Sequence, residues 1–387
     1  MVNGEFCIVN EESLMSLNVV ELTSQLVAIP SETPTTNSAV SDFLEKVLVQ
    51  AGFAVERLSY IDPNGEEKVN LVGKKGSGSG GLGLFSHSDT VPGDAGWDPF
   101  TPVVQEGKLY GRGSCDMKGP LAASIVAASR FDAAQLTKPL FIAVTSDEEN
   151  GHIGSYFIVA ESKLLTGGWP AYCVVCEPSE LLPVYAHKGG TRIVVTAHGV
   201  AAHTSTDKGE SANFKIAPFL AEMSDLAKVF RTDKRFQNDE FSPPTNGFNL
   251  VLNDGGAPIN VTAGKTVATL GLRAMPNAAF AEAIQMVVER ARAHNLEVEV
   301  AGRSISHFYV SPDSPAVQAA CRATGAARAV TVPYGTEAVT YQPYMQSVVL
   351  GPGSIAQAHT VGEWIDIAQL EEAVEVYSRL IEDLCTK

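Results

Sequence analysis

The sequence is short of positive charge, and this excludes one group of partners. It contains 28 Lys and Arg residues against 44 Asp and Glu residues, which gives a formal net charge of −16 at pH 7. Proteins bind nucleic acids and anionic membranes through clustered Lys and Arg side chains. We therefore expect no nucleic-acid partner and no membrane partner, and we expect a few local cations to meet any anionic substrate.

Long apolar runs and a dense set of cysteines are also missing. No stretch of about 20 apolar residues occurs, and the segment from Met1 to Glu5 lacks the basic residues and apolar run of a secretory signal. The six cysteines are scattered through 387 residues: Cys7, Cys115, Cys173, Cys176, Cys321 and Cys385. This is unlike a small scaffold held by disulfides, so we expect reduced thiols and a cytoplasmic protein.

Two short motifs match known binding motifs, but the residues around them do not fit a metal site or a dinucleotide site. Cys173 and Cys176 form a Cys-x-x-Cys pair within a strand-like apolar run, where alternating faces keep the two thiols from one metal ion, so we expect core residues. Residues 76–81 match G-x-G-x-x-G, but they are followed by a strand-like run rather than by the helix that would receive a pyrophosphate. We interpret this segment as a flexible hairpin loop.

What the sequence does contain is an alternation of short apolar runs with helix-like segments. Apolar runs cover residues 82–85, 140–144 and 172–175, and a helical pattern covers residues 121–131. This order predicts an α/β domain with a mostly parallel sheet flanked by helices. Ligands of such sheets gather at the carboxyl ends of the strands, so polar residues there are the candidates for chemistry.

The pattern changes after Gly190 to two-residue alternation combined with helices, which predicts a smaller α+β domain inserted into the first. Its expected elements are 191–198, 212–230, 248–252, 266–272, 279–294 and 297–300, after which a buried strand at 347–350 and an amphipathic helix at 368–385 return to the first domain. We therefore assign residues 1–190 and 304–387 to the larger domain and residues 191–303 to the insert.

Histidine and carboxylate residues follow the predicted strands or lie in loops, in an order that suits a metal centre. A pair of borderline-soft divalent ions prefers imidazole nitrogen and carboxylate oxygen, and a carboxylate can bridge because each of its oxygens can hold one ion. We predict that two divalent metal ions are bound by His87, Asp116, Glu149, Glu177 and His359.

Two acidic neighbours of these ligands have other predicted roles. Asp89 follows His87 by two residues, and the end of a strand can place its carboxylate behind the imidazole, where ligating histidines are usually oriented. Glu148 and Glu149 point in different directions from an extended or turn-like backbone. With Glu149 as a ligand, Glu148 is the predicted general base, which takes a proton from the attacking water and delivers it to the leaving amine.

Each of these motifs is common when taken singly. An acidic triplet such as residues 147–149 is usually a solvated loop or a helix N-terminus, and a His-x-Asp sequence is usually incidental. Five such segments with the expected ligand types in the expected order favour a metal centre.

The same segments resemble the M20 family of di-zinc peptidases and deacylases, over essentially the whole chain. The matching segments are 87–92, 109–113, 116–119, 147–149 and 177–179. Further segments resemble the branch of that family that removes the acetyl group of N-acetylornithine: 138–140, 183–189, 335–338, 350–355 and 357–359.

The resemblance implies a catalytic domain interrupted by a lid domain that also pairs two subunits as a homodimer. It implies a partition of the ligands as well: His87 and Glu177 would hold one ion, Glu149 and His359 the other, and Asp116 would bridge them. The ions would be zinc, with cobalt as an alternative.

The resemblance further implies residues that contact the substrate. Residues 199–205 match the family segment whose histidine, here His203, stabilises the developing oxyanion, often across the dimer. Asn260 and Arg273 match positions that contact the substrate carboxylate, and we place Gly353 among the substrate-binding residues. The chain departs from the family's usual Asp-x-Arg here, because Gly271 occupies the position of the acidic partner of Arg273.

The expected reaction is hydrolysis of the amide bond of a small N-acyl amino acid, N-acetylornithine in the first place, to acetate and a free amine. Alternatives are a succinyl-diaminopimelate or dipeptide substrate at the same metal core, or a non-catalytic protein that binds a metal or ligand. The presence of Glu148 and of all five ligands is evidence against the non-catalytic alternative. The absence of a G-x-S-x-G elbow disfavours a serine hydrolase.

Overall fold

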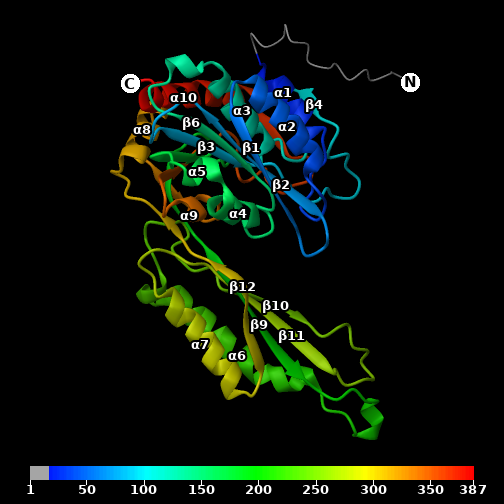
Figure 1. Ribbon diagram of the computed structural model, residues 1–387. Coiled ribbons are helices and arrows are strands. Elements are labelled where there is room, and N and C mark those ends of the chain that lie inside the picture. Colours follow the sequence, from blue (N-terminus) through cyan, green and yellow to red (C-terminus); the bar gives the residue numbers. More distant parts are fainter. Residues whose placement is uncertain (1–16) are drawn as a thin grey trace, which may run out of the picture. The chain divides into compact units, whose positions relative to one another are not determined.

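The computed structural model describes residues 17–387 and divides them into two compact units, drawn in Figure 1. The larger unit contains the chain up to Tyr185 together with residues 310–330 and 336–387. The smaller unit contains residues 186–309 and 331–335.

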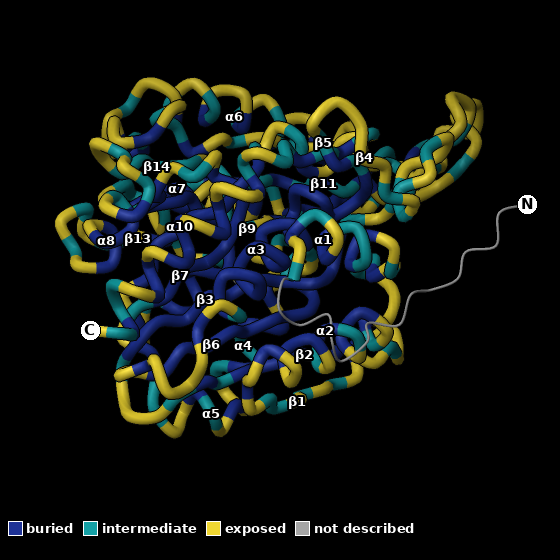
Figure 2. The backbone as a smooth tube through the Cα atoms, turned by 90° about the horizontal axis from the view of Figure 1, so that it is seen from above, coloured by how far each residue is buried: buried dark blue, intermediate teal, exposed yellow. Residues whose placement is uncertain are grey.

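The larger unit is built on a sheet whose four central strands are parallel. They are, in spatial order, β6 (Leu140–Thr145), β3 (Leu82–His87), β7 (Tyr172–Val175) and β15 (Gln346–Val349). Every residue of β3 and β6 is buried (Figure 2), as expected for parallel strands covered on both faces. Antiparallel strands β2 (Glu67–Lys75) and β1 (Ala54–Ile61) extend one edge, and β8 (Val184–His187) pairs with β15 at the other.

Helices cover both faces of this sheet (Figure 1). One face carries α1 (Val19–Val27), α2 (Ser38–Gln50), α3 (Lys118–Ser129), α8 (Pro315–Thr324) and α10 (Ile367–Cys385). The other carries α4 (Ile153–Glu161), α5 (Lys163–Thr166) and α9 (Ala338–Tyr341). A separate small sheet is formed by β16 (Trp364–Asp366), β5 (Lys108–Tyr110) and β4 (Val103–Gln105). Short 3-10 helices cover Ala133–Gln135, Thr204–Thr206 and Lys234–Phe236.

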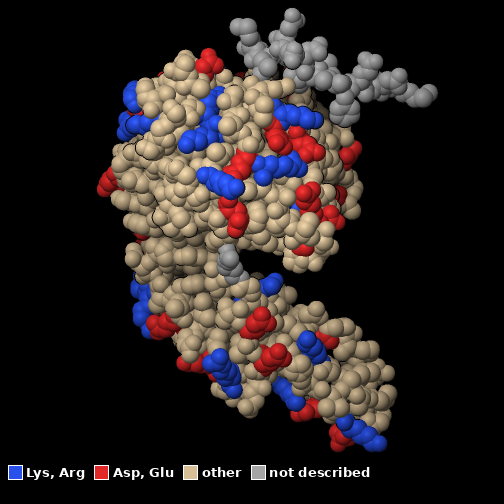
Figure 3. Space-filling model, viewed as in Figure 1, with Lys and Arg blue, Asp and Glu red and all other residues tan. Residues whose placement is uncertain are grey.

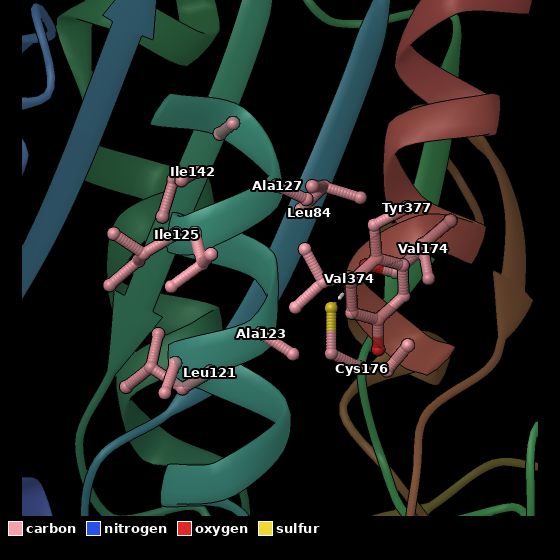
Figure 4. Close-up of a cluster of buried hydrophobic side chains, with 14 of the residues drawn as sticks. Leu84, Leu121, Ala123, Ile125, Ala127, Ile142, Val174, Cys176, Val374 and Tyr377 are labelled. Atoms are coloured by element: carbon pink, nitrogen blue, oxygen red, sulfur yellow. Dashed lines mark hydrogen bonds between the residues drawn. The ribbon is translucent and has the colours of Figure 1, made fainter. Parts of the chain in front are cut away.

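Helix α3 is the centre of the core. It is buried on nearly all sides because it packs against the sheet, α1 and α10; Figure 4 shows its side facing α10. Leu121 and Ile125 point away from α10, whereas the small Ala123 and Ala127 face α10 and let the two helices approach closely. Cys176 is packed in the same cluster, which confirms its predicted role as a core residue.

The smaller unit is a four-stranded antiparallel sheet with two helices on one face. The strand order is β10 (Asn249–Asn253), β11 (Lys265–Leu272), β9 (Gly190–His198) and β12 (Glu297–Ile305), and the helices are α6 (Ala212–Thr232) and α7 (Phe280–Ala293). Buried and less buried residues alternate along β11, so one face of the sheet contacts the helices. The short strands β13 (Phe308–Tyr309) and β14 (Val330–Val332) pair with β8.

Five of the six cysteines are free thiols, and Cys173 is fully buried like Cys176. Cys7 and the segment from Met1 to Glu5 lie outside the described residues. Within residues 17–387, no helix combines the length and the apolar composition needed to cross a membrane.

Candidate metal centre

The five predicted ligands belong to the larger unit, and three of them lie at or just after the ends of its central strands. His87 is the last residue of β3, Glu149 lies in the turn after β6, and Glu177 follows β7 by two residues. Asp116 lies in the loop that leads into α3, and His359 lies between β15 and β16. Because β6, β3 and β7 are parallel neighbours, their carboxyl ends bring the first three side chains to one edge of the sheet.

Two sets of donor atoms share Asp116. In the first set, His87 Nε2 lies 3.3 Å from Asp116 Oδ1 and 3.6 Å from Glu177 Oε1. In the second set, His359 Nε2 lies 2.9 Å from Glu149 Oε1 and 3.4 Å from Asp116 Oδ2. Within each set of three, the ligand atoms are all within 4.8 Å of one another. One oxygen of Asp116 thus faces each set, which is the arrangement of a bridging carboxylate.

Asp89 lies behind the imidazole of His87 and also holds the turn that carries Glu148 and Glu149. Its Oδ1 is 3.5 Å from His87 Nδ1, and its backbone oxygen is 3.0 Å from the same nitrogen, so Nε2 is the nitrogen turned toward Asp116. The backbone N–H groups of Glu148 and Glu149 donate to its two carboxylate oxygens, each at 3.2 Å. Burial alone would raise the pKa of Asp89, but these hydrogen bonds and His87 lower it, so its carboxylate form is favoured.

The turn after β6 is also fixed from the other side by Asp147. This residue has a left-handed backbone with φ of 53°. Its buried carboxylate pairs with Lys68 Nζ at 2.9 Å and accepts a hydrogen bond from Tyr60 at 2.7 Å. Asp147 therefore shapes the turn, whereas its two successors offer their carboxylates to the centre.

Sequence reasoning missed Glu363, which holds the loop that carries Asp116. Its Oε1 accepts from the backbone N–H groups of Cys115 (2.9 Å) and Asp116 (3.0 Å). Its Oε2 accepts from the N–H of Gly113 (3.1 Å) and from the fully buried Arg112 (2.9 Å). A lone acidic residue in the sequence gives no signal of this role, because its partners lie about 250 positions earlier.

The buried carboxylates repel one another, and their pKa values show it. Burial, together with the charges of Asp116 and Glu148, raises the pKa of Glu149 to about 7 although His359 opposes the shift. Burial and the charge of Asp116 also raise the pKa of Glu177. Hydrogen bonds to Asp116 and Glu149 raise the pKa of His359 to about 10. The cluster has more negative charge than its imidazoles offset, so bound cations would stabilise it.

The donor set therefore fits divalent metal ions. It combines two imidazole nitrogens with carboxylate oxygens, has a carboxylate positioned to bridge, and leaves an excess of buried negative charge for cations to neutralise. Glu148 also lies near this centre, since one of its oxygens is within 4.8 Å of ligand atoms of His87 and Glu149.

Gly353 also belongs to the larger unit and packs beside the loop of Asp116. Its φ is 91°, and a Cβ atom on it would come within 2.6 Å of Cys115 Sγ, so a side chain is excluded. Its backbone N–H donates to the side-chain oxygen of Gln369.

His203 and Asn260 lie together in the smaller unit. An isolated bridge pairs His203 with Val261, and the N–H of Thr204 donates to the backbone oxygen of Asn260 at 3.0 Å. The N–H of Ser205 donates to His203 Nδ1 at 3.2 Å, so in the neutral ring the proton is on Nε2. Nε2 of this exposed imidazole forms no hydrogen bond within residues 17–387 and can therefore donate to a substrate.

Arg273 lies at the opposite end of the same unit. Asn260 precedes β11 and Arg273 directly follows it, and the eight residues of this strand span about 26 Å at roughly 3.3 Å per residue. A small substrate cannot reach both residues within one chain.

The chain is similar to known proteins over most of its length. The family described as peptidase family M20/M25/M40 matches residues 83–383. The chain is 34% identical to acetylornithine deacetylase of Proteus mirabilis over 382 residues, which covers 95% of this chain and 96% of that protein.

Solved structures share the fold. A tripeptidase of Staphylococcus aureus has a TM-score of 0.75 at 20% identity, covering 97% of this chain and 99% of that one. A dinuclear metal binding peptidase of family M20 from Bacillus subtilis has a TM-score of 0.63 at 14% identity, covering 95% and 97%. The predicted fold class, an α/β domain with a central mostly parallel sheet and a second, smaller sheet domain, is confirmed.

Proposed function

The chain belongs to peptidase family M20/M25/M40, and from this premise we propose that it uses two divalent metal ions to hydrolyse the amide bond of N-acetylornithine. The observation that carries the proposal is the pair of donor sets that share Asp116. The preference for this substrate rests on the likeness to acetylornithine deacetylase.

We assign one ion to His87 and Glu177 and the other to Glu149 and His359, with Asp116 between them. Zinc suits this set of nitrogen and oxygen donors, and cobalt is the alternative. When bound, such ions polarise the scissile carbonyl and lower the pKa of the attacking water.

Residues of the chain then transfer the proton of the attacking water and stabilise the negative charge that develops on the substrate oxygen. Glu148 accepts the proton of the attacking water and passes it to the nitrogen of the leaving amine. His203 donates its Nε2–H to the oxygen that becomes negative as the water attacks. Asn260, Arg273 and Gly353 are the proposed contacts of the substrate, and Arg273 suits a carboxylate because its planar fork can grip both oxygens.

A homodimer formed through the smaller unit completes the proposal. His203 and Asn260 lie at one end of β11 and Arg273 at the other, so a substrate that contacts all three needs residues from two copies of the chain. β10 is an edge strand and presents the exposed apolar side chains of Val251 and Leu252.

Metal removal and a substrate panel test the reaction. The protein is dialysed against a chelator, reloaded with zinc or cobalt, and assayed with N-acetylornithine, succinyl-diaminopimelate and a set of dipeptides. We expect no turnover after chelation, recovery after reloading, and the highest kcat/KM for N-acetylornithine. A higher kcat/KM for succinyl-diaminopimelate or a dipeptide would refute N-acetylornithine as the preferred substrate. No turnover of any of these compounds would refute the proposed amide hydrolase activity.

The role of Glu148 is tested by its substitution. Glu148→Gln keeps the size of the side chain but removes the base, so we expect kcat to fall about 100- to 10,000-fold while the bound metal, measured by elemental analysis, is unchanged. Glu161→Gln on the exposed surface of α4 is the matched control and keeps the wild-type kcat. Wild-type turnover by Glu148→Gln would show that another group accepts the proton.

A further inference from the structure

His152 contacts the proposed base, although the mechanism above gives it no role. Its Nε2 lies 3.1 Å from Glu148 Oε1, and both side chains are about nine-tenths buried. A carboxylate has no proton to donate, so the hydrogen between the two atoms is on Nε2. The imidazole therefore holds one particular oxygen of Glu148.

The backbone of His152 has a conformation that is unfavourable for a residue with a side chain. Its φ is 62°, in the left-handed region where a residue with a Cβ atom is about 1 kcal/mol or more less stable than glycine. His152 is the N-cap residue of α4, a position where glycine is well tolerated, but its side chain makes no capping hydrogen bond. Neither helix capping nor backbone conformation explains a histidine here.

The other hydrogen bonds of His152 hold its backbone, and the ring is oriented by Glu148. Its backbone N–H donates to the carbonyl of Glu148 at 3.1 Å, and its carbonyl accepts from Ser155 Oγ at 2.9 Å, so backbone and side chain are anchored in one turn. Its other ring nitrogen, Nδ1, is buried and has no hydrogen-bond partner among residues 17–387. The contact with Glu148 is thus the polar contact that orients the imidazole.

We propose that His152 is a positioning residue for the general base: it holds Oε1 of Glu148 so that Oε2 faces the attacking water. This rests on the function proposed above. In the reaction, Oε2 accepts the proton of the water and returns it to the leaving nitrogen, while His152 keeps its own proton throughout. The imidazole acts through the geometry of Glu148 and does not touch the substrate.

Two substitutions at His152 test this. His152→Gly removes the imidazole and relieves the left-handed backbone, so we expect a folded protein with full metal content. Its kcat should fall about 10- to 100-fold with KM within about twofold, the usual size of effect when a partner that orients an active-site group is lost. His152→Gln places an amide N–H near the position of Nε2, so we expect it to restore most of the lost kcat. His294→Gln, which alters a histidine 2.8 Å from Glu222 in the smaller unit, is the control and keeps the wild-type kcat.

A second readout does not depend on turnover. In protein labelled with ¹⁵N-histidine, NMR should show the His152 ring with its proton on Nε2, and its signal should shift in Glu148→Ala but not in Glu297→Ala, which removes the partner of the exposed His198. A proton on Nδ1, or no response to Glu148→Ala, would overturn the contact.

The kinetic outcomes separate this inference from the proposed function. A kcat of His152→Gly within twofold of wild type, or a fall in kcat accompanied by equal loss of metal, would overturn positioning and leave the proposed function intact. A wild-type protein that hydrolyses none of the tested amides would overturn the proposed function and the catalytic role of His152, even if NMR shows the contact.

Discussion

Glu363 holds the loop of Asp116, the proposed bridging ligand, through four hydrogen bonds. We expect Glu363→Ala to lower the free energy of unfolding by about 3 to 5 kcal/mol, because three backbone N–H groups of the loop lose their acceptor and the buried Arg112 keeps only the half-exposed Asp94 as a carboxylate partner among residues 17–387. Asp116 also loses its backbone anchor, so we expect the affinity for zinc to fall about 10- to 100-fold. Urea denaturation and calorimetric zinc titration measure the two effects.

The control for Glu363 is an ion pair on the surface. Glu372→Ala removes an exposed carboxylate 2.6 Å from Arg379, and such pairs contribute about 0 to 1 kcal/mol. Equal losses of stability in Glu363→Ala and Glu372→Ala, or unchanged zinc affinity in Glu363→Ala, would contradict the anchoring role.

The proposed ligands can be selected from the sequence, whereas the groups that hold them in place cannot. His87 and Asp89 are recognisable because they are two residues apart at the end of a predicted strand. Glu148 and Glu149 are recognisable because they are adjacent. Glu363 lies 247 positions from Asp116, whose backbone it holds, so local spacing contains no trace of it. His152 was missed for another reason: its role depends on a left-handed backbone and a side-chain direction that a short motif does not specify.

At the scale of elements, the glycine-rich segment before β3 has a structural role. Gly81 has φ of 81°, and a Cβ atom on it would overlap the carbonyl oxygen of Pro139, at the point where β3 enters between β6 and β7. Gly65, in the turn between β1 and β2, has φ of 90° and open space around it. The two glycines differ in the room for a side chain but not in backbone conformation.

This pair gives a matched test. We expect Gly65→Ala to lower the free energy of unfolding by about 1 kcal/mol, the cost of a left-handed alanine. Gly81→Ala adds a steric overlap with backbone, so we expect a larger loss of roughly 2 to 4 kcal/mol. Chemical denaturation followed by circular dichroism measures both, and equal losses would refute the steric explanation.

The helices and strands themselves were largely predictable because their patterns are strong. The buried runs at 82–85 and 140–144 and the amphipathic helix at 368–385 agree closely with β3, β6 and α10. Patterns did not reveal that the parallel part of the sheet is limited to four central strands, since strand pairing depends on contacts between distant segments. Helix α3 begins three residues earlier than its apolar run, at Lys118, because Pro120 is compatible with the first turn of a helix.

At the scale of the whole molecule, the dependence of stability on pH comes from buried groups more than from surface pairs. Acidic and basic side chains are interspersed on the face seen in Figure 3, and exposed pairs of this kind add little. Lys75 is buried, and desolvation lowers its pKa to about 8, although the charge of Asp132 opposes the shift. Its ammonium group donates to the carbonyls of Ala128 and Phe131.

The sign of the effect of Lys75 follows from its two pKa values. An unfolded lysine has a pKa of about 10.4, so between about pH 8 and pH 10.4 the unfolded chain holds a proton that the folded chain has released. The contribution of Lys75 to the free energy of unfolding therefore rises with pH across this window, by up to about 1.4 kcal/mol per pH unit. We expect Lys75→Met to remove this rise in urea denaturation at pH 7 to 10. Lys74→Met on the same strand is the control, and parallel curves for all three proteins would contradict the prediction.

The proposed action of His203 on the metal centre of a second copy would involve two chains, and neither periodicity nor spacing can reveal such a relation. His203 and Asn260 lie about one strand length from Arg273, so within one chain they cannot contact the same small substrate. If His203 acts on the site of a second copy, a subunit that lacks the base can still donate its histidine. A mixture of two inactive variants then distinguishes action within a chain from action between chains.

We expect Glu148→Gln and His203→Ala to be nearly inactive when pure and to regain activity when they are unfolded together and refolded as a mixture. About a quarter of wild-type activity is expected, because about half of the dimers are mixed and each mixed dimer has one complete site. The control is a mixture of Glu148→Gln and Glu149→Ala. Both substitutions damage the centre of the larger unit, so we expect this mixture to regain no activity. No recovery in the test mixture, while native mass spectrometry shows mixed dimers, would place His203 on the site of its own chain. Val251→Glu on the edge strand β10 should abolish dimer and complementation together, whereas Val104→Glu on the edge strand β4 should preserve both.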